Sequence, residues 1–421
     1  MDRRKVLKGL GFGFATLPFI QVKATQPTLK DYSSYFTTDQ TTDEKFWKKF
    51  RKDFYDVPDD FINLENGYFG VQPIPVYKAY LQNIEQVNVN SSRYLRTDYS
   101  KDFTEIKSGL SDFACIDAGE ALITRNATEA LNIAIQGLDW QKGDEVILSG
   151  QDYFSMIETF EMLEKQKGII VRRIDLPLLP ESDEEIIKQY EAAVSSNTRC
   201  ILLTHMIHLT GQILPVKKIA DRFKPQGIDI IVDAAHSFAQ IDFNLKDLGA
   251  DFVGVTLHKW FGNPLGAGLL YVNKTRIKDL SPLFGDSGAD ADDIKKLDHF
   301  GTLSVPTILT IPNAQAFNET ITIPVKEKRL RYLQNYWTSR AKEIPNVMVT
   351  TPYDPARSCA IASFKIEGMQ TKDVIQQLYD KKKVFTVIRY LPDQEVVRVT
   401  PSLYNLTEEL DVLIDGIKSI A

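Results

Sequence analysis

The feature that most constrains the fold is an alternation between short apolar runs and helical patterns from about residue 120 to residue 272. The apolar runs are ALIT, DEVILS, IIVRRID, CILLTHM, IDIIVD, DFVGVTL and GAGLLYV. After the first run, Ala127, Ala130, Leu131, Ala134 and Leu138 recur at helical spacing. Strands that alternate with helices predict an α/β domain with a mainly parallel sheet.

A smaller domain is predicted after this region. A long helical pattern begins near residue 315 and is followed by the strand-like runs MVTT, CAIASFKIEG and VVRVTP. Further helices are predicted at TKDVIQQLYDKK and at the C-terminus. We therefore predict a large domain over residues 61–312 and a small α+β domain over residues 313–421, joined by an N-terminal segment over residues 26–60.

Residues 1–25 differ from the rest of the chain. The run RRKVLK, which contains Arg3 and Arg4, precedes a short Gly- and Phe-rich apolar stretch and resembles a twin-arginine export signal. We expect the twin-arginine export machinery to carry the protein to the periplasm or beyond, and cleavage and retention as a membrane anchor both stay open. The alternative is a basic tail without this function, which leaves the protein in the cytoplasm.

Composition narrows the possible partners. The net charge of -6 gives no reason to expect a nucleic-acid partner, which would favour a basic chain. Cys115, Cys200 and Cys359 are widely spaced, so the sequence predicts neither a disulfide framework nor a metal site. A hydrophobic content of 43% and a charged content of 25% are typical of an ordinary globular protein.

Two side chains of opposite charge follow two of the apolar runs. Asp233 ends IDIIVD, and Lys259 follows DFVGVTLH 26 residues later. That interval fits one strand–helix–strand unit, which places both side chains at the carboxyl ends of neighbouring parallel strands. Ligands of open α/β sheets bind at that edge. For these two residues alone, a structural ion pair is the alternative.

An acid and an amine at this edge suit pyridoxal phosphate. The cofactor needs a lysine for its Schiff base and a carboxylate that keeps its pyridine nitrogen protonated. The lysine must be partly desolvated, so that its amine is a nucleophile near neutral pH. Lys259 lies in HKWFGNPLGAGLLYV, where apolar runs flank it. We therefore predict that Lys259 and Asp233 hold this cofactor.

The phosphate of such a cofactor needs its own site. In TRNATEALN, Asn126, Ala127 and Thr128 begin a helical pattern, and helix N-terminal amides attract a phosphate. A plain helix N-cap is the alternative. Thr256 and His258, directly before the lysine, are further candidates for phosphate contacts, although a buried histidine bonded to backbone is an alternative for His258.

The chain resembles the class V aminotransferase family through four stretches in the same order: TRNATEALN, THMIHLTGQILPV, VDAAHSFAQIDFNLKDLGADFVGVTLHKWFGNPLGAGLLYV and VRVTPSLYNLTEELD. The family includes cysteine desulfurases, kynureninases and isopenicillin N epimerase-like proteins, and TRNATEALN is most similar to the last group. The resemblance covers residues 60–420. It implies the fold-type I architecture: an α/β large domain with a mainly parallel seven-stranded type of sheet and a smaller α+β C-terminal domain.

The resemblance also implies roles for individual residues. Lys259 is the catalytic residue and carries the Schiff base, and Asp233 pairs with the pyridinium nitrogen. An aromatic ring at Tyr153 stacks on the cofactor, with a core aromatic as the alternative, and His236 bonds near the 3-oxygen. Thr302, in FGTLSVP, reaches the phosphate of a second subunit, which implies a homodimer with active sites at the interface. The full set of implied cofactor-binding residues is Ala127, Thr128, Tyr153, His208, Asp233, His236, Thr256, His258, Lys259 and Thr302.

On the substrate side, the resemblance implies that Arg398 binds the α-carboxylate and that Asn66 also contacts the substrate. A guanidinium suits a carboxylate because two parallel N–H bonds fix distance and orientation; a surface ion pair is the alternative. Arg93 and Arg389 are further candidates for contact with the substrate side chain.

Two departures from the family pattern bear on the reaction. The segment KKKVFTVIRYLPDQEVVR lacks the nucleophilic cysteine of cysteine desulfurases, so a protein persulfide is not expected. His208 replaces a frequent asparagine, which either alters the reaction or replaces a hydrogen bond.

We expect an enzyme that acts on a small amino-acid-type substrate by transamination. Epimerisation, C–S lyase chemistry and a non-catalytic cofactor-binding role are the alternatives. A dinucleotide-binding enzyme is set aside because no G-x-G-x-x-G follows a strand.

Overall fold

The computed structural model describes residues 36, 40–285, 288–299 and 301–421. The predicted export signal, with Arg3 and Arg4, lies outside the described residues. Within the described part of the chain, no helix has both the length and the apolar character needed to cross a bilayer.

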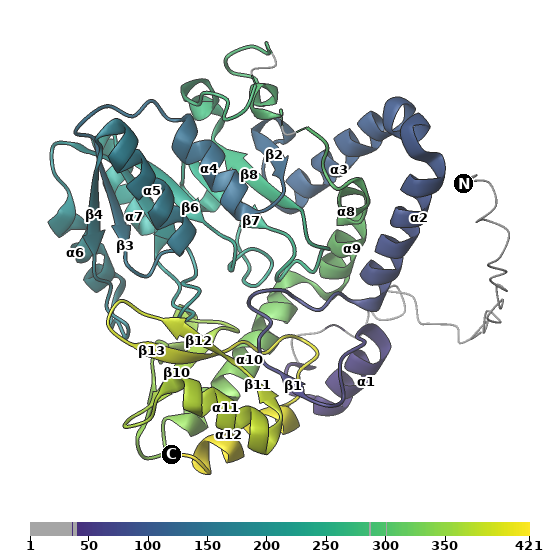
Figure 1. Ribbon diagram of the computed structural model, residues 1–421, viewed down its shortest axis with the longest axis vertical. Helices are drawn as coiled ribbons and strands as arrows, with labels where there is room; N and C mark the ends of the chain where they lie inside the picture. Colours follow the sequence, from purple (N-terminus) through teal and green to yellow (C-terminus); the bar gives the residue numbers. More distant parts are fainter. Residues whose placement is uncertain (1–35, 37–39, 286–287, 300) are drawn as a thin grey trace, which may run out of the picture.

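A seven-stranded sheet forms the centre of the larger part of the molecule (Figure 1). Its strand order is β2-β8-β7-β6-β5-β3-β4, and β8 runs antiparallel to both of its neighbours, whereas β7, β6, β5, β3 and β4 are mutually parallel. The strands are β2 (Ala121–Thr124), β3 (Glu145–Ser149), β4 (Ile170–Ile174), β5 (Thr198–Thr204), β6 (Asp229–Asp233), β7 (Phe252–Thr256) and β8 (Gly268–Val272). The predicted α/β class with a mainly parallel sheet is confirmed.

Both faces of this sheet are buried, which explains why its strands are continuous apolar runs. In β6, Ile230 and Val232 pack into one hydrophobic cluster, whereas Ile231 packs into a second cluster with α4 and α5. Successive side chains of a strand point to opposite faces, so the two clusters lie on the two sides of the sheet. The helices that contact the sheet are α3 (Tyr99–Phe113), α4 (Ala127–Gly137), α5 (Phe154–Lys167), α6 (Asp183–Ala193) and α7 (Val216–Phe223). α2 (Ile74–Thr97), α8 (Val305–Leu309) and α9 (Ile311–Ile321) pack on α3.

A second sheet lies below the first in Figure 1, with α10 running between the two regions. Its order is β12-β13-β10-β9, and all its pairings are antiparallel. We call β9–β13 with α10–α12 the small-sheet region. Its elements are α10 (Ile323–Ala341), β9 (Val347–Val349), β10 (Ala362–Ile366), α11 (Thr371–Lys382), β11 (Val384–Phe385), β12 (Val387–Tyr390), β13 (Glu395–Val399) and α12 (Thr407–Lys418).

The N-terminal segment packs on this small-sheet region. β1 (Ile62–Asn63) pairs in parallel with β11. α1 (Glu44–Phe54) is held by Arg329 of α10, whose guanidinium lies 2.5 Å from the Glu44 carboxylate and covers the ring of Trp47. These contacts place the chain after α1, residues 61–71, beside the C-terminal strands. Short 3-10 helices connect other elements at Ala118–Glu120, Lys224–Gln226, Leu245–Leu248, Lys274–Asp279, Ile294–Leu297 and Pro355–Arg357.

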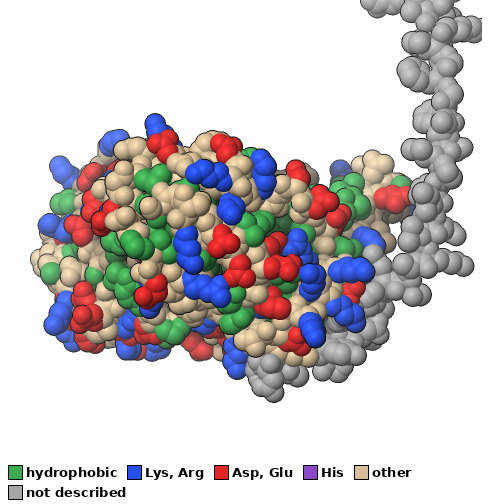
Figure 2. Space-filling view, turned by 90° about the horizontal axis from the view of Figure 1, so that it is seen from below, with side chains coloured by type: hydrophobic (Ala, Val, Ile, Leu, Met, Phe, Trp, Pro, Cys, Tyr) green, Lys and Arg blue, Asp and Glu red, His purple; other side chains and the backbone are tan. Residues whose placement is uncertain are grey.

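The surface on the small-sheet side carries charges of both signs. Figure 2 shows Lys and Arg side chains interspersed with Asp and Glu side chains over this face. A mixed surface of this kind creates no strong field of one sign, so this face has no electrostatic preference for a polyanion.

Candidate active site

Lys259 lies three residues beyond the end of β7, with its amine turned toward the neighbouring β6 edge. Its Nζ is 3.0 Å from His236 Nε2. Burial lowers the pKa of Lys259 to about 8, and the nearby Asp233 carboxylate only partly opposes this effect. An amine whose pKa is lowered in this way is available as a nucleophile and base near neutral pH.

The contacts of His236 determine which of its ring nitrogens carries the hydrogen. Trp260 Nε1 donates to His236 Nδ1 at 3.4 Å, and an indole N–H can only donate. Burial lowers the pKa of His236 well below its ordinary value, so the ring is neutral. Its hydrogen is therefore on Nε2, where it can be donated to Lys259 when that amine is in its neutral form. Trp260 directly follows Lys259 in HKW, so the local sequence places the indole that bonds to His236 next to the lysine.

Asp233 ends β6, the strand next to β7. The side chain is buried, and its Oδ1 accepts the backbone N–H of Ala235 at 2.9 Å. Burial raises the pKa of Asp233, while the bond to Ala235 and the charge of Lys259 oppose the rise. The expected neighbourhood of Asp233 and Lys259 at the carboxyl edge of the sheet is therefore present in the structure.

The N-terminus of α4 lies at the same edge of the sheet. Asn126 caps the helix by accepting the N–H of Glu129 at 2.9 Å, which leaves the first amides, those of Ala127 and Thr128, without acceptors in the helix. The backbone of Asn126 lies against Gly268 of β8, which is the register partner of Thr256. The helix start and the end of β7 thus meet, as a phosphate site requires.

Thr256 and His258 are bonded to each other at this strand end. Thr256 Oγ1 is 3.0 Å from His258 Nδ1, and burial with the charge of Lys259 lowers the pKa of His258 to about 4. Both side chains are therefore neutral hydrogen-bonding groups beside the start of α4.

Tyr153 and His208 form the next wall. Their rings meet edge to face with centroids 5.5 Å apart, and the His208 ring lies nearly parallel to that of His236 at 6.3 Å. Within the described chain, the buried His208 Nδ1 has no hydrogen-bond partner. Burial, with the charges of Arg398 and Lys259, lowers the pKa of His208 well below its ordinary value.

Arg398 lies on β13 and is almost fully buried. It donates to the backbone carbonyl of His208 at 2.8 Å and to Oε1 of Glu65. Burial lowers the pKa of Arg398 to about 10, and Glu65 opposes this, so the guanidinium stays charged at neutral pH. Arg389 of β12 also donates to Glu65, at 2.9 Å. Two arginines therefore share one buried carboxylate, an arrangement that carries a net positive charge.

Glu65 was not among the residues predicted from the sequence. It stands in LENGYFG, where the prediction named only Asn66. An acidic residue directly after Leu64 and shortly before Tyr68 and Phe69 was the available signal, because a buried carboxylate needs a cationic partner. The partners themselves are more than 300 positions away in the chain, and only the structure reveals them.

Two glycines let this segment pass close to both sides of the site. A Cβ at Gly70 would lie 2.4 Å from the backbone oxygen of Lys259, and one at Gly67 would lie 2.9 Å from Nη2 of Arg398. The N–H of Gly70 donates to the carbonyl of His258 at 3.1 Å. The segment 65–70 therefore spans from the arginine pair to the lysine.

The remaining candidates lie at different distances from this centre. Asn66 is buried, but its side chain donates to the carbonyl of Thr400 at 2.9 Å and accepts from the Tyr404 hydroxyl at 2.7 Å. Thr302 is exposed on the loop before α8, and α8 itself packs on the loop that follows Lys259. Arg93 is exposed on α2. The structure does not bring these three side chains to the lysine, and their roles stay predictions.

The chain belongs to the class V aminotransferase family, whose model matches residues 72–412. Its curated relatives include isopenicillin N epimerase of Streptomyces clavuligerus, which is 24% identical over 71% of this chain and 79% of the relative. A probable cysteine desulfurase of Methanothermobacter thermautotrophicus is 25% identical over 86% of this chain and 95% of the relative.

Solved structures show the same fold. The apo cysteine desulfurase of Thermococcus onnurineus NA1 superposes with a TM-score of 0.77 at 19% identity, over 88% of this chain and 97% of the other. The cystine C–S lyase C-DES in complex with cysteine persulfide gives 0.75 at 19% identity, over 86% and 98% of the two chains. The fold is therefore that of the pyridoxal-phosphate enzymes of fold-type I.

The residues present fit the family's cofactor, pyridoxal phosphate. Among the residues that the structure describes, the Lys259 amine has no carboxylate within bonding distance, Asp233 has one oxygen beyond its backbone bond, and the first amides of α4 have no acceptor. The buried, unpartnered Nδ1 of His208 is a further polar atom that a ligand would satisfy. Lys259, Asp233, His236 and the phosphate-side residues Ala127, Thr128, Thr256 and His258 would hold the group.

Proposed function

We propose that this protein transfers the amino group of an α-amino-acid-type substrate, with Lys259 as the base. The observation that carries the proposal is the buried Lys259 amine, whose pKa is lowered to about 8 and whose Nζ lies 3.0 Å from His236 Nε2. An enzyme that activates an α-proton needs a neutral amine of this kind near the reacting carbon.

Each residue has a defined task in this reaction. Arg398 binds the substrate carboxylate and so places the α-carbon on the lysine side of the site. Lys259 removes the α-proton and holds it until it returns to carbon, while His236 keeps the amine oriented. When bound, pyridoxal phosphate supplies the electron sink and accepts the amino group. The substrate leaves as a 2-oxo acid after hydrolysis by water.

Epimerisation is the second candidate, because His208 provides a possible second proton donor. Its ring is adjacent to Tyr153 and His236, and its Nδ1 has no partner within the described residues. Inversion at a carbon requires a base and an acid on opposite faces. Two curated relatives are named isopenicillin N epimerase, which supports this candidate.

A desulfurase that carries a persulfide is not proposed. Cys359 Sγ is buried against the carbonyls of Gln240 and Glu327, and burial raises its pKa to about 12. Cys200 is buried in β5, and Cys115 is exposed after α3. Two of these thiols are buried, and the exposed Cys115 lies on neither the segment of Lys259 nor that of Arg398, so none suits the attack on a substrate sulfur.

The test is to incubate the holoenzyme with a set of amino acids in deuterated water and to follow both substrate and cofactor. Transamination predicts a 2-oxo acid and pyridoxamine phosphate, together with deuterium at the α-carbon of the amino acid recovered from the reaction. Inversion with deuterium but without oxo acid would select epimerisation, and release of a thiol or sulfide would select elimination. The absence of α-deuteration with every amino acid would overturn the proposal and favour a non-catalytic binding protein. Lys259→Ala is the matched control.

A further inference from the structure

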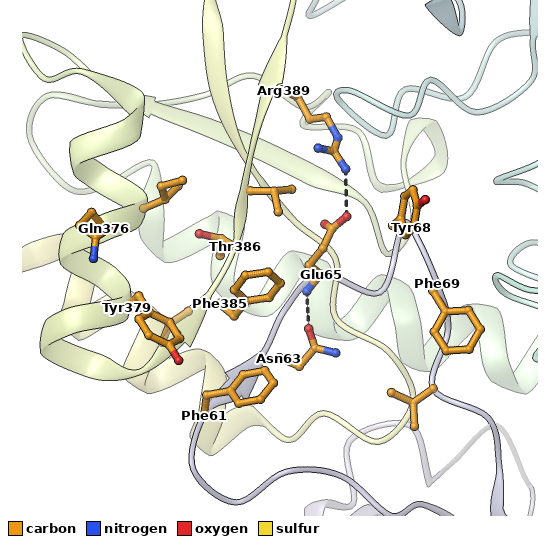
Figure 3. Close-up of a pocket in the computed structure, with 14 residues that line it drawn as sticks. Phe61, Asn63, Glu65, Tyr68, Phe69, Gln376, Tyr379, Phe385, Thr386 and Arg389 are labelled. Atoms are coloured by element: carbon orange, nitrogen blue, oxygen red, sulfur yellow. Dashed lines mark hydrogen bonds and ion pairs between the residues drawn. The ribbon is translucent and has the colours of Figure 1, made fainter. Parts of the chain in front are cut away.

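A cavity of about 820 Å³ opens beside the arginine pair (Figure 3). Its inner end contains Glu65 and Arg389, and Glu65 is also bonded to Arg398. The cavity therefore shares Glu65 with Arg398, the residue that binds a substrate carboxylate in the proposed function. Its other walls come from the N-terminal segment 61–71, from α11 and from β11 with the start of β12.

The walls of this cavity are mainly apolar, and five of the fourteen lining residues are aromatic. Phe61 and Phe385 meet edge to face with centroids 6.1 Å apart, where β1 pairs with β11. Tyr379 of α11 lies on the same side as Phe385, and Tyr68 and Phe69 line the opposite side in Figure 3. Tyr68 is 74% exposed and Phe385 41% exposed, which is a large apolar area to leave in water.

The size and position of the cavity limit what it can hold. Cavities of 300–1,000 Å³ are typical of sites for ligands of drug size, whereas about 150 Å³ is enough for benzene. In the proposed function, the amino group of the substrate goes to the cofactor and its carboxylate to Arg398. The substituent of the α-carbon that remains is the side chain. Because the cavity begins next to the position of the substrate carboxylate, the side chain can extend into it.

We infer that this cavity binds the side chain of the substrate, and that the substrate class is α-amino acids whose side chain ends in an apolar or aromatic group larger than one ring. This inference rests on the proposed function for the placement of the substrate head. Aromatic walls bind such a group by area and by edge-to-face contacts. The pair of Glu65 and Arg389 at the inner end offers polar atoms to a link between the head and the apolar end.

The test uses carboxylic acids without an amino group, so that binding is independent of the chemistry at Lys259. We would compare 3-(biphenyl-4-yl)propanoate with propanoate on the holoenzyme by calorimetry. The inference predicts at least tenfold tighter binding of the biphenyl acid, and a tenfold loss of this advantage in Phe385→Ser combined with Tyr379→Ser. Tyr353→Ser is the matched control, since Tyr353 is also an exposed aromatic of the small-sheet region, at 58%, but does not line the cavity.

Equal affinity for the two acids, or an advantage that survives the double substitution, would overturn the inference. A change of oligomeric state in Phe385→Ser, without any preference for the biphenyl acid, would overturn it in favour of a second subunit covering the cavity. α-Deuteration of amino acids without preference for large side chains would remove this inference and leave the proposed function. A biphenyl preference without α-deuteration of any amino acid would remove the proposed function and leave a site for bulky apolar carboxylates.

Discussion

Asp233, His236 and Lys259 come from one short stretch of the chain, whereas Glu65, Arg389 and Arg398 come from segments near its two ends. The first group lies at the ends of adjacent parallel strands, where burial on both faces fixes the backbone. The second group is assembled where the N-terminal segment packs on the small sheet. In the proposed function, the lysine side has the local rigidity that chemistry requires, and the arginine side binds the substrate with residues from segments that are distant in the chain.

The electrostatics of the two sides also differ. On the lysine side, burial favours neutral forms, since it lowers the pKa of Lys259 and of His236. On the arginine side, two guanidinium groups form ion pairs with one carboxylate, and the buried Nε of Arg398 has no hydrogen-bond partner among the described residues. We expect substitutions on the lysine side to change the rate of chemistry and substitutions on the arginine side to change affinity.

The largest effect is expected for Lys259→Ala. Removal of the base that handles the α-proton should lower kcat by about 10³- to 10⁴-fold, in the range of general acid–base contributions. The measurement is the rate of α-deuteration together with the visible spectrum of the bound cofactor. Lys259→Arg, which keeps a cation but is no base near neutral pH, should be equally inactive. Activity within tenfold of the wild type in either variant would exclude this role.

Next in size is Arg398→Ala. The substitution removes a buried cation and leaves Glu65 paired only with Arg389. Loss of one partner of a buried hydrogen-bonded charge pair costs about 2–5 kcal/mol, so KM for an amino acid should rise at least thirtyfold. The cofactor spectrum should not change. Arg398→Lys, which keeps the charge without the two parallel N–H bonds, should recover part of the affinity. A loss of cofactor with unchanged KM would contradict the separation of the two sides.

A third prediction concerns the pH dependence of the cofactor-free protein. Because the pKa of Lys259 is about 8 in the folded state and near 10.5 when unfolded, the unfolded chain binds more protons between these values. The free energy of unfolding should therefore rise with pH from about 8 to 10.5, by on the order of 2 kcal/mol from this residue. Lys259→Met should remove this rise and should stabilise the protein below pH 8. Denaturant titrations of both proteins at pH 7 and pH 10 measure the difference.

The lysine side could be predicted from the sequence more easily than the arginine side. Asp233 and Lys259 could be placed together because each follows an apolar run and because parallel strands end at one edge. Ala127 and Thr128 could be placed because a helix start is visible in TRNATEALN. No periodicity connects LENGYFG with VIRY or VVRV, so the meeting of Glu65 with two arginines depends on how the chain ends pack.

The family resemblance also identified segments more reliably than individual side chains. Asn66 lies one position from Glu65, yet its amide bonds to Thr400 and Tyr404 behind the site. Adjacent residues of an extended segment point in opposite directions, so a family motif can mark the segment without identifying the side chain that faces the substrate. The predicted role of Thr302 involves the phosphate of a second subunit, and it stays a prediction.

The smallest effect is expected for Glu65→Gln, and it concerns the affinity for simple carboxylates. In Glu65→Gln, the carboxylate that occupies Arg398 before the substrate binds is replaced by a neutral amide of the same shape. A substrate carboxylate must displace Glu65 from Arg398, and hydrogen bonds to charged groups contribute about 1.5–3 kcal/mol. Part of that cost disappears in the variant, so simple carboxylates such as propanoate should bind about tenfold more tightly. The rate of α-deuteration at saturating substrate should change less than threefold, because Lys259, His236 and Asp233 are untouched. Weaker binding of propanoate would instead mean that Glu65 holds Arg398 in position for the substrate, and the two arginines would then form one carboxylate site that depends on their shared anion.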